Sequence, residues 1–130
     1  MATALTQADF SLIVKATEII QARYKEDHHH IGAALRTKDG QIFAGVHVEA
    51  YIGRITLCAE AVAIGMAESA GDHEVDTIVA VGVDGTVVSP CGMCRELISD
   101  YGPQARVIVP GIDGPVKVTI QELLPNKYTR

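Results

Sequence analysis

The sequence predicts an α/β fold in which a β-sheet lies between layers of helices. Stretches of helical periodicity alternate with short apolar stretches typical of strands, and the expected order of elements is α-β-β-α-β-α-β-α. The length of 130 residues corresponds to a single domain spanning residues 1–130, since domains average roughly 150 residues. Apolar residues make up 48% and charged residues 21%, which excludes intrinsic disorder and a coiled coil.

The predicted strands are short, apolar and bounded by glycine or polar turn residues; they cover residues 31–35, 41–48, 77–83 and 105–109. The Asp39-Gly40 pair between the first two is a strong hairpin signal. The third strand is a continuous apolar run, which is typical of a strand buried on both faces.

The predicted helices have apolar residues at helical spacing; they cover residues 6–24, 56–70, 90–101 and 119–124. Thr6 and Asp9 form a capping box at the start of the first, and Gly71 ends the second. Ser89 is the expected N-cap of the third helix, with Pro90 at its first position.

Charge and hydropathy narrow the class of protein. Eleven lysines and arginines against sixteen acidic residues give a net charge of −5 with no basic block, which argues against nucleic acid as a partner. No apolar run approaches the ~20 residues of a membrane helix. The N-terminus also lacks the cationic and apolar stretches of a signal peptide. We therefore expect a cytoplasmic protein without a membrane partner.

The three cysteines, Cys58, Cys91 and Cys94, are the most informative residues. An odd number does not form a closed set of disulfides. Cys91 and Cys94 share one face at the start of a predicted helix, and Cys58 lies near the start of another. A helix N-terminus stabilises a thiolate, so three convergent thiolates would hold zinc tetrahedrally and leave one position open for catalysis.

Glu60 follows Cys58 by two positions, so its side chain would pass beside the metal and could carry a proton. The combination of Cys-Ala-Glu with a later Pro-Cys-x-x-Cys matches the signature of zinc nucleobase deaminases, with cysteine in place of the first histidine. Two alternatives are open. One is a closed structural zinc site with His47 or a residue of 28–30 as fourth ligand; the other is a redox dithiol, which would leave Cys58 and Glu60 without a role.

On these residues the chain resembles the small homotetrameric cytidine deaminases, which include the blasticidin-S deaminases. The motifs that carry the resemblance are Ile31-Gly32-Ala33-Ala34-Leu35, Lys38-Asp39-Gly40, Gly45-Val46-His47-Val48-Glu49, Cys58-Ala59-Glu60, Ser89-Pro90-Cys91-Gly92-Met93-Cys94-Arg95 and Glu122-Leu123-Leu124-Pro125. The resemblance implies a three-layer α-β-α fold with a mixed central sheet. It also implies a homotetramer with shared active sites and Zn²⁺ held by the three cysteines.

The implied chemistry is hydrolytic. Glu60 would take a proton from zinc-activated water, deliver it to the ring N3 and then protonate the departing amine. Backbone groups of Ala59 and Cys91 would contact the base.

The chain departs from the family pattern at residues facing the substrate. Where cytidine deaminases carry Asn-x-Glu-Asn to bind the ribose, this chain has His47 and Glu49, so sugar binding is expected in altered form. His29 stands where a phenylalanine often packs near the substrate. Tyr128 stands where the family closes a neighbouring subunit's base pocket with an aromatic ring.

Three thiolates on Zn²⁺ leave a formal charge of −1, which disfavours the formation of hydroxide. The family often offsets this charge with an arginine after the glutamate or between the paired cysteines, but Ala61 and Met93 occupy these positions. Arg95 and Arg54 are the remaining candidates, and Arg95 could equally be a solvated residue or a subunit contact.

The predicted function is therefore zinc-dependent deamination of cytosine in a free nucleoside, such as cytidine or deoxycytidine, or in an analogue such as blasticidin S. The acidic charge favours a free nucleoside over a polynucleotide. A catalytically silent, zinc-stabilised scaffold and a hydrolase of N4-substituted cytosine nucleosides are the alternatives.

Overall fold

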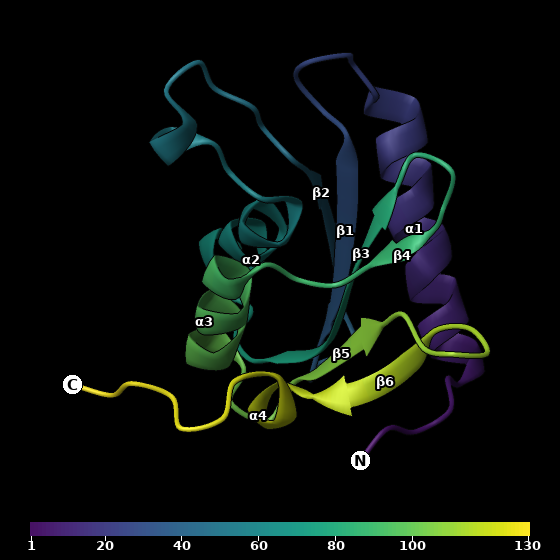
Figure 1. Ribbon diagram of the computed structural model, residues 1–130, viewed down its shortest axis with the longest axis vertical. Helices are drawn as coiled ribbons and strands as arrows, with labels where there is room; N and C mark the ends of the chain where they lie inside the picture. The colour runs from purple at the N-terminus through teal and green to yellow at the C-terminus, as the bar shows by residue number, and fades with distance from the viewer.

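The computed structural model describes all residues 1–130 and contains a mixed β-sheet between helices (Figure 1). The helices are α1 (Gln7–Arg23), α2 (Ala59–Ser69), α3 (Gly92–Tyr101) and α4 (Ile120–Leu123), with a short 3₁₀ helix η1 (Gly53–Ile55). The strands are β1 (Ile31–Thr37), β2 (Ile42–Val46), β3 (Val75–Gly82), β4 (Val87–Val88), β5 (Arg106–Val109) and β6 (Val116–Thr119). None of the helices combines the length and apolar character needed to cross a membrane.

The sheet has the order β2-β1-β3-β5-β6, and β4 pairs with β3 outside this path. Strands β3 and β5 are parallel, whereas the other pairs are antiparallel. The predicted hairpin forms between β1 and β2, with Gly32 opposite Val46, and Gly40 in its turn has φ +88°. The predicted α/β class and mixed sheet are confirmed.

Alternating side chains of the central strands create a core on each face of the sheet. On one face, Ala34 and Val79 belong to a buried cluster with Leu12, Ala16 and Ile20 of α1. On the other face, Leu35 and Ile78 lie in a cluster with residues of α2 and α3. Figure 1 shows α1 on one side of the sheet and α2 and α3 on the other.

Two glycines allow the helices to approach the sheet closely. A Cβ on Gly32 would lie 2.4 Å from the backbone oxygen of Ala16 in α1. A Cβ on Gly45 would lie 2.7 Å from a methyl group of Val62 in α2. Side chains at these two strand positions would therefore push the helices away from β1 and β2.

The third helix begins later than predicted, and its N-cap is Cys91 rather than Ser89, so the expected roles of Ser89 and Pro90 are wrong. The reason is non-local. Residues 87–88 pair with β3 as β4 and hold the chain extended up to the proline. A residue before proline also prefers extended backbone. The later start places the Cys91 side chain at the helix terminus.

The second helix also begins later than predicted, at Ala59, because Leu57 forms a bridge with Val48 and keeps the preceding segment extended. Its end at Gly71 is confirmed, with φ +77°.

Strands β4 and β6 were not predicted. In β6, the sequence Val-Lys-Val-Thr alternates apolar and polar residues as a strand does. A strand of four residues directly after a turn is too short for this alternation to identify it.

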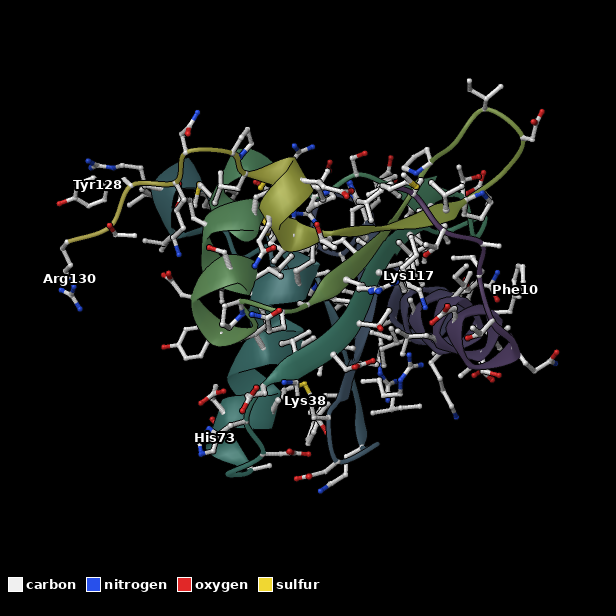
Figure 2. All side chains as sticks on the ribbon, turned by 90° about the horizontal axis from the view of Figure 1, so that it is seen from below. Phe10, Lys38, His73, Lys117, Tyr128 and Arg130 are labelled. Atoms are coloured by element: carbon white, nitrogen blue, oxygen red, sulfur yellow. The ribbon has the colours of Figure 1, made fainter.

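The predicted capping box at the start of α1 is present and is part of a larger network. The Thr6 N–H donates to Asp9 Oδ2 over 2.9 Å, and the Asp9 N–H donates to Thr6 Oγ1 over 3.3 Å. The fully buried Asp9 carboxylate also accepts from Arg36 of β1 at 3.2 Å and from Lys117 of β6 at 2.7 Å. Figure 2 shows Lys117 reaching from β6 toward α1. Asp9 thus connects α1 to two strands.

This network predicts an acid-dependent loss of stability. Burial alone would raise the pKa of Asp9, but hydrogen bonds from Lys117, Thr6 and Arg36 lower it from 3.8 to about 2. A lowered folded-state pKa stabilises the protein above pH 3.8, and this contribution is lost as the pH falls toward 2. We expect Asp9→Asn to lower the free energy of unfolding by about 2 kcal/mol at pH 7, and the difference to vanish near pH 2.

Urea unfolding of the wild type and the variant at several pH values measures this difference. Asp113→Asn, in the exposed turn before β6, is the matched control and should change stability little at any pH. A destabilisation by Asp9→Asn that is equally large at pH 7 and pH 2 would contradict the assignment.

Candidate active site

The three cysteines converge where α2 and α3 begin. Cys58 is the N-cap of α2, Cys91 is the N-cap of α3, and Cys94 lies in the first turn of α3. Their Sγ atoms all lie within 4.8 Å of one another, and those of Cys58 and Cys91 are 3.7 Å apart. The structure therefore brings together the three residues that the sequence selected as metal ligands.

The donor set fits zinc. Sulfur atoms bound to zinc at ~2.3 Å in a tetrahedron are about 3.8 Å apart, close to the observed separation of Cys58 and Cys91. The cluster consists of the three sulfur atoms alone; His47 and residues 28–30 do not belong to it. A fourth protein ligand, as a closed structural site requires, is thus not supplied by these histidines.

The thiols influence one another's ionisation. Burial raises the pKa of Cys58. Burial and then the negative charge of Glu60 raise the pKa of Cys94 far above its ordinary value. Burial acts in the same sense on Cys91, but hydrogen bonds from the backbone N–H of Cys94 and from Cys58 outweigh it and lower the pKa. A divalent cation would supply the positive charge that three neighbouring thiolates need.

Glu60 lies in the first turn of α2 and is 5% exposed. Burial raises the pKa of its carboxyl group. The residue lines a cavity of about 330 Å³ together with Cys58 and Cys91. A buried carboxyl group next to the cluster, but outside it, occupies the place expected of a proton carrier.

The same cavity receives two of the expected substrate-binding residues, His47 and Ala59. His29 is not among its lining residues; its Nδ1 is hydrogen-bonded to the backbone oxygen of His47 over 2.8 Å. His30 lines the cavity instead. The family pattern had placed residue 29 near the substrate, but β1 begins only at Ile31, and residues 26–28 form a turn that the Lys25–His29 bridge closes.

Glu49 lies one step farther from the cluster, next to His47. Its Oε1 is 2.8 Å from His47 Nε2, and its Oε2 accepts from Thr56 Oγ1 over 3.2 Å. The hydrogen bond from His47 is the main reason that the pKa of Glu49 lies below its ordinary value. The structure therefore joins the two residues expected to face the sugar into one hydrogen-bonded pair.

The remaining candidates lie outside the cluster. Arg95 donates from Nε to the Pro90 oxygen over 3.0 Å and from Nη1 to the Leu123 oxygen over 3.1 Å, so its guanidinium group is directed at backbone oxygens. Arg54 lies in η1. Tyr128 is 80% exposed on the C-terminal tail, which Figure 2 shows extending away from the helices and the sheet. None of these three residues lines the cavity of Glu60.

Sequence reasoning missed Ser89 and Val88 as cavity residues. Ser89 was assigned to a helix cap, which would have occupied its hydroxyl group. The signal that could have corrected this is the Val87-Val88 pair, which is strand-like and directly precedes a Ser-Pro dipeptide.

Fold and cluster together define a zinc-dependent nucleobase deaminase. Residues 6–110 match the family model described as the cytidine and deoxycytidylate deaminase zinc-binding region. The chain belongs to this family.

Known relatives extend this match over nearly the whole chain. The chain is 54% identical to a blasticidin-S deaminase of Bacillus cereus, over 97% of this chain and 96% of the relative. It is 33% identical to a cytidine deaminase of Halalkalibacterium halodurans, over 93% of this chain and 95% of the relative. The crystal structure of cytidine deaminase from Mycobacterium leprae is similar with a TM-score of 0.80 at 27% identity, covering 94% of this chain and 100% of that structure. The expected three-layer fold is confirmed.

Proposed function

We propose that this protein removes the C4 amino group of cytosine, in a free nucleoside or in an analogue such as blasticidin S, by zinc-dependent hydrolysis that releases ammonia. The observation that carries the proposal is the buried Glu60 carboxyl group beside three convergent thiols. The names of the relatives, blasticidin-S deaminase and cytidine deaminase, support both substrate types.

In this proposal the ion is held by Cys58, Cys91 and Cys94. Zinc, when bound, acts as a Lewis acid that makes water a better nucleophile at neutral pH. Glu60 accepts one proton of the attacking water and delivers it to N3 of the ring, which makes C4 electrophilic, and the water oxygen bonds to C4. The same carboxyl group then takes the second proton of that oxygen and delivers it to the departing amine, so that ammonia leaves and a C4 carbonyl group forms. One residue therefore serves both proton transfers. Burial of Glu60 keeps these protons from exchanging with bulk water.

Other residues orient the substrate. Backbone groups of Ala59 and Cys91 contact the base, while His47 and Glu49 face the sugar. His29 fixes the backbone of His47 and thereby acts on the site indirectly. The positive charge of Arg95, held next to the turn that carries Cys91, is the favoured offset for the third thiolate, and Arg54 is the second candidate.

We infer that the active enzyme is a homotetramer in which subunits complete one another's sites. Large apolar side chains are exposed beside the cysteine cluster, where Leu57 and Met93 line a surface pocket with Cys58 and Cys94, and at η1, where Ile52 and Ile55 are exposed. Such a patch is typical of a protein interface. Tyr128 on the extended tail would close the base pocket of a neighbouring subunit.

The three cysteines are free thiols, which fits a protein of a reducing compartment such as the cytoplasm.

An ultraviolet difference spectrum tests the function directly. The purified zinc protein is incubated with cytidine, deoxycytidine, cytosine, blasticidin S and N4-acetylcytidine, and ammonia is measured in parallel. We expect conversion of a nucleoside or of blasticidin S, with one ammonia per product. Product from N4-acetylcytidine alone would instead identify a hydrolase of N4-substituted cytosine. No product from any compound would favour the silent scaffold.

A further inference from the structure

We propose that His30 is a positioning residue for the sugar-facing pair His47 and Glu49. The turn that His30 closes holds the His47 imidazole in one tautomer and one orientation, so His30 acts on the substrate through His47. This inference rests on the proposed function and concerns the same site.

His30 closes the turn directly before β1. Residues 26–28 form this turn, and the backbone N–H of Asp27 donates to His30 Nε2 over 2.9 Å. The same imidazole stacks on the ring of Tyr24, the C-cap of α1, with the ring centroids 5.8 Å apart and an angle of 25° between the planes. Two contacts from one side chain thus determine where the turn lies and where the backbone of His30 points.

The turn is attached at three points to the segment that carries the sugar-facing pair. The backbone N–H of His30 donates to His47 Nδ1 over 3.2 Å. His29 Nδ1 donates to the backbone oxygen of His47 over 2.8 Å. The backbone N–H of Glu49 donates to the His28 oxygen over 3.0 Å. Figure 1 shows the two segments, between α1 and β1 and between β2 and α2, rising at the same end of the molecule, so a displacement of the turn would move the pair.

The hydrogen bond from His30 determines the tautomer of His47. Because Nδ1 accepts this bond, the ring proton lies on Nε2, which donates to Glu49 Oε1 over 2.8 Å. The His47 side chain is only 13% exposed, so its two nitrogens depend on these protein partners rather than on water. The other carboxylate oxygen of Glu49 accepts from Thr56. The bond from His30 therefore fixes the donor that orients the Glu49 carboxylate.

A positioning role predicts an effect on substrate binding rather than on the chemical step. In the proposed function His47 and Glu49 face the sugar, whereas Glu60 transfers protons at the base. The hydrogen bonds that hold the turn involve neither Glu60 nor a cysteine. Loosening the turn should therefore raise KM and change kcat little.

Two substitutions of His30 separate its hydrogen-bond acceptor from its ring. His30→Phe keeps an aromatic ring for Tyr24 but cannot accept from the N–H of Asp27, whereas His30→Gln keeps an acceptor without the ring. The substrate is cytidine or blasticidin S, whichever the wild-type zinc protein converts. We expect His30→Phe to raise KM about fivefold with less than about a twofold change in kcat, in line with the loss of one hydrogen bond. His30→Gln should restore most of the wild-type KM.

The matched control is His73→Phe. His73 is bonded to Glu68 and does not line the cavity, so this variant removes an imidazole elsewhere and should keep the wild-type KM.

Nuclear magnetic resonance on the zinc protein, labelled with nitrogen-15 histidine, observes His47 directly. A ring N–H bonded to a carboxylate is protected from exchange with water and gives its own proton signal, which a freely rotating imidazole does not. We expect this Nε2–H signal in the wild type, its loss in His30→Phe and its return in His30→Gln. The His47→Asn variant, which lacks the imidazole, assigns the signal.

An unchanged KM or an intact His47 signal in His30→Phe would overturn the positioning role. So would a His30→Gln variant that behaves like His30→Phe, or a fall in kcat at constant KM, which would identify the turn as a part of the fold alone. A wild type that converts neither compound would refute the proposed function. The His47 signal would still decide whether His30 positions His47, so the two failures are distinguishable.

Discussion

Glu60→Gln is expected to lower kcat for cytosine deamination by at least about 10³-fold, while the protein still binds about one zinc ion per chain. General acid–base catalysis by one positioned group contributes roughly 10²- to 10⁴-fold, and Glu60 serves two proton transfers. Glutamine has nearly the shape of glutamate but cannot accept the proton, so the substitution separates proton transfer from packing.

The same change should leave the fold intact. Burial raises the pKa of Glu60, which means that the folded protein disfavours its charged form. Replacement by a neutral amide removes this unfavourable term, so the variant should melt at or slightly above the temperature of the wild type. Loss of activity would then be a chemical effect rather than the result of unfolding.

Activity, zinc content and thermal melting are measured on the same preparations. Glu68→Gln is the matched control, since Glu68 lies on the same helix and bonds the exposed His73 instead of facing the cavity. It should retain wild-type kcat. Normal turnover by Glu60→Gln would show that another group moves the protons, and loss of zinc from this variant would show that Glu60 is a ligand.

The cluster could be predicted from the sequence because its information is local. Cys58 and Glu60 lie two residues apart, and Cys91 and Cys94 three apart, so a helix start alone determines how each pair is presented. That the N-termini of α2 and α3 lie next to each other depends on the tertiary fold, and this was expected only from the resemblance to the family. Capping at Thr6 and the turn at Gly40 were predictable for the same reason, because each depends on neighbouring residues.

The parts that were missed depend on partners far away in the chain. Val87 and Val88 form a strand only because β3 offers an edge, and this pairing delays α3 and places Ser89 at the cavity. The choice between His29 and His30 depends on where β1 begins and on the turn before it, which the family pattern at residue 29 does not reveal. Asp9 was predicted as a cap, but its ion pairs with two strands require the tertiary fold.

Cys94→Ala is expected to abolish zinc binding after dialysis against a chelator and to abolish deamination with it. Cys94 is 2% exposed and lies in the core cluster beside Ile98, so the loss also affects packing. With only two sulfur ligands left, the affinity for zinc should be too low for the ion to remain bound in the presence of a chelator. Inductively coupled plasma mass spectrometry should find about one zinc per wild-type chain and almost none in the variant.

The ion should also stabilise the fold, because it would join the start of α2 through Cys58 to the start of α3 through Cys91 and Cys94. A ligand present at 1,000 times its Kd stabilises the folded state by about 4 kcal/mol. For a chain of 130 residues this corresponds to a rise in Tm on the order of 10–20 °C. Addition of zinc should therefore raise the Tm of the metal-free wild type but not that of Cys94→Ala.

Packing and ligation can be told apart at this position. Cys94→Ser preserves most of the side-chain volume, so it should lose the zinc-dependent rise in Tm while the metal-free proteins melt at similar temperatures. Ser99→Ala, farther along α3, should keep both zinc and activity, because Ser99 bonds only the Glu96 oxygen of its own helix. If Cys94→Ser retained zinc and deaminated cytosine normally, the third sulfur would not be a ligand, and the three-thiol centre would have to be abandoned.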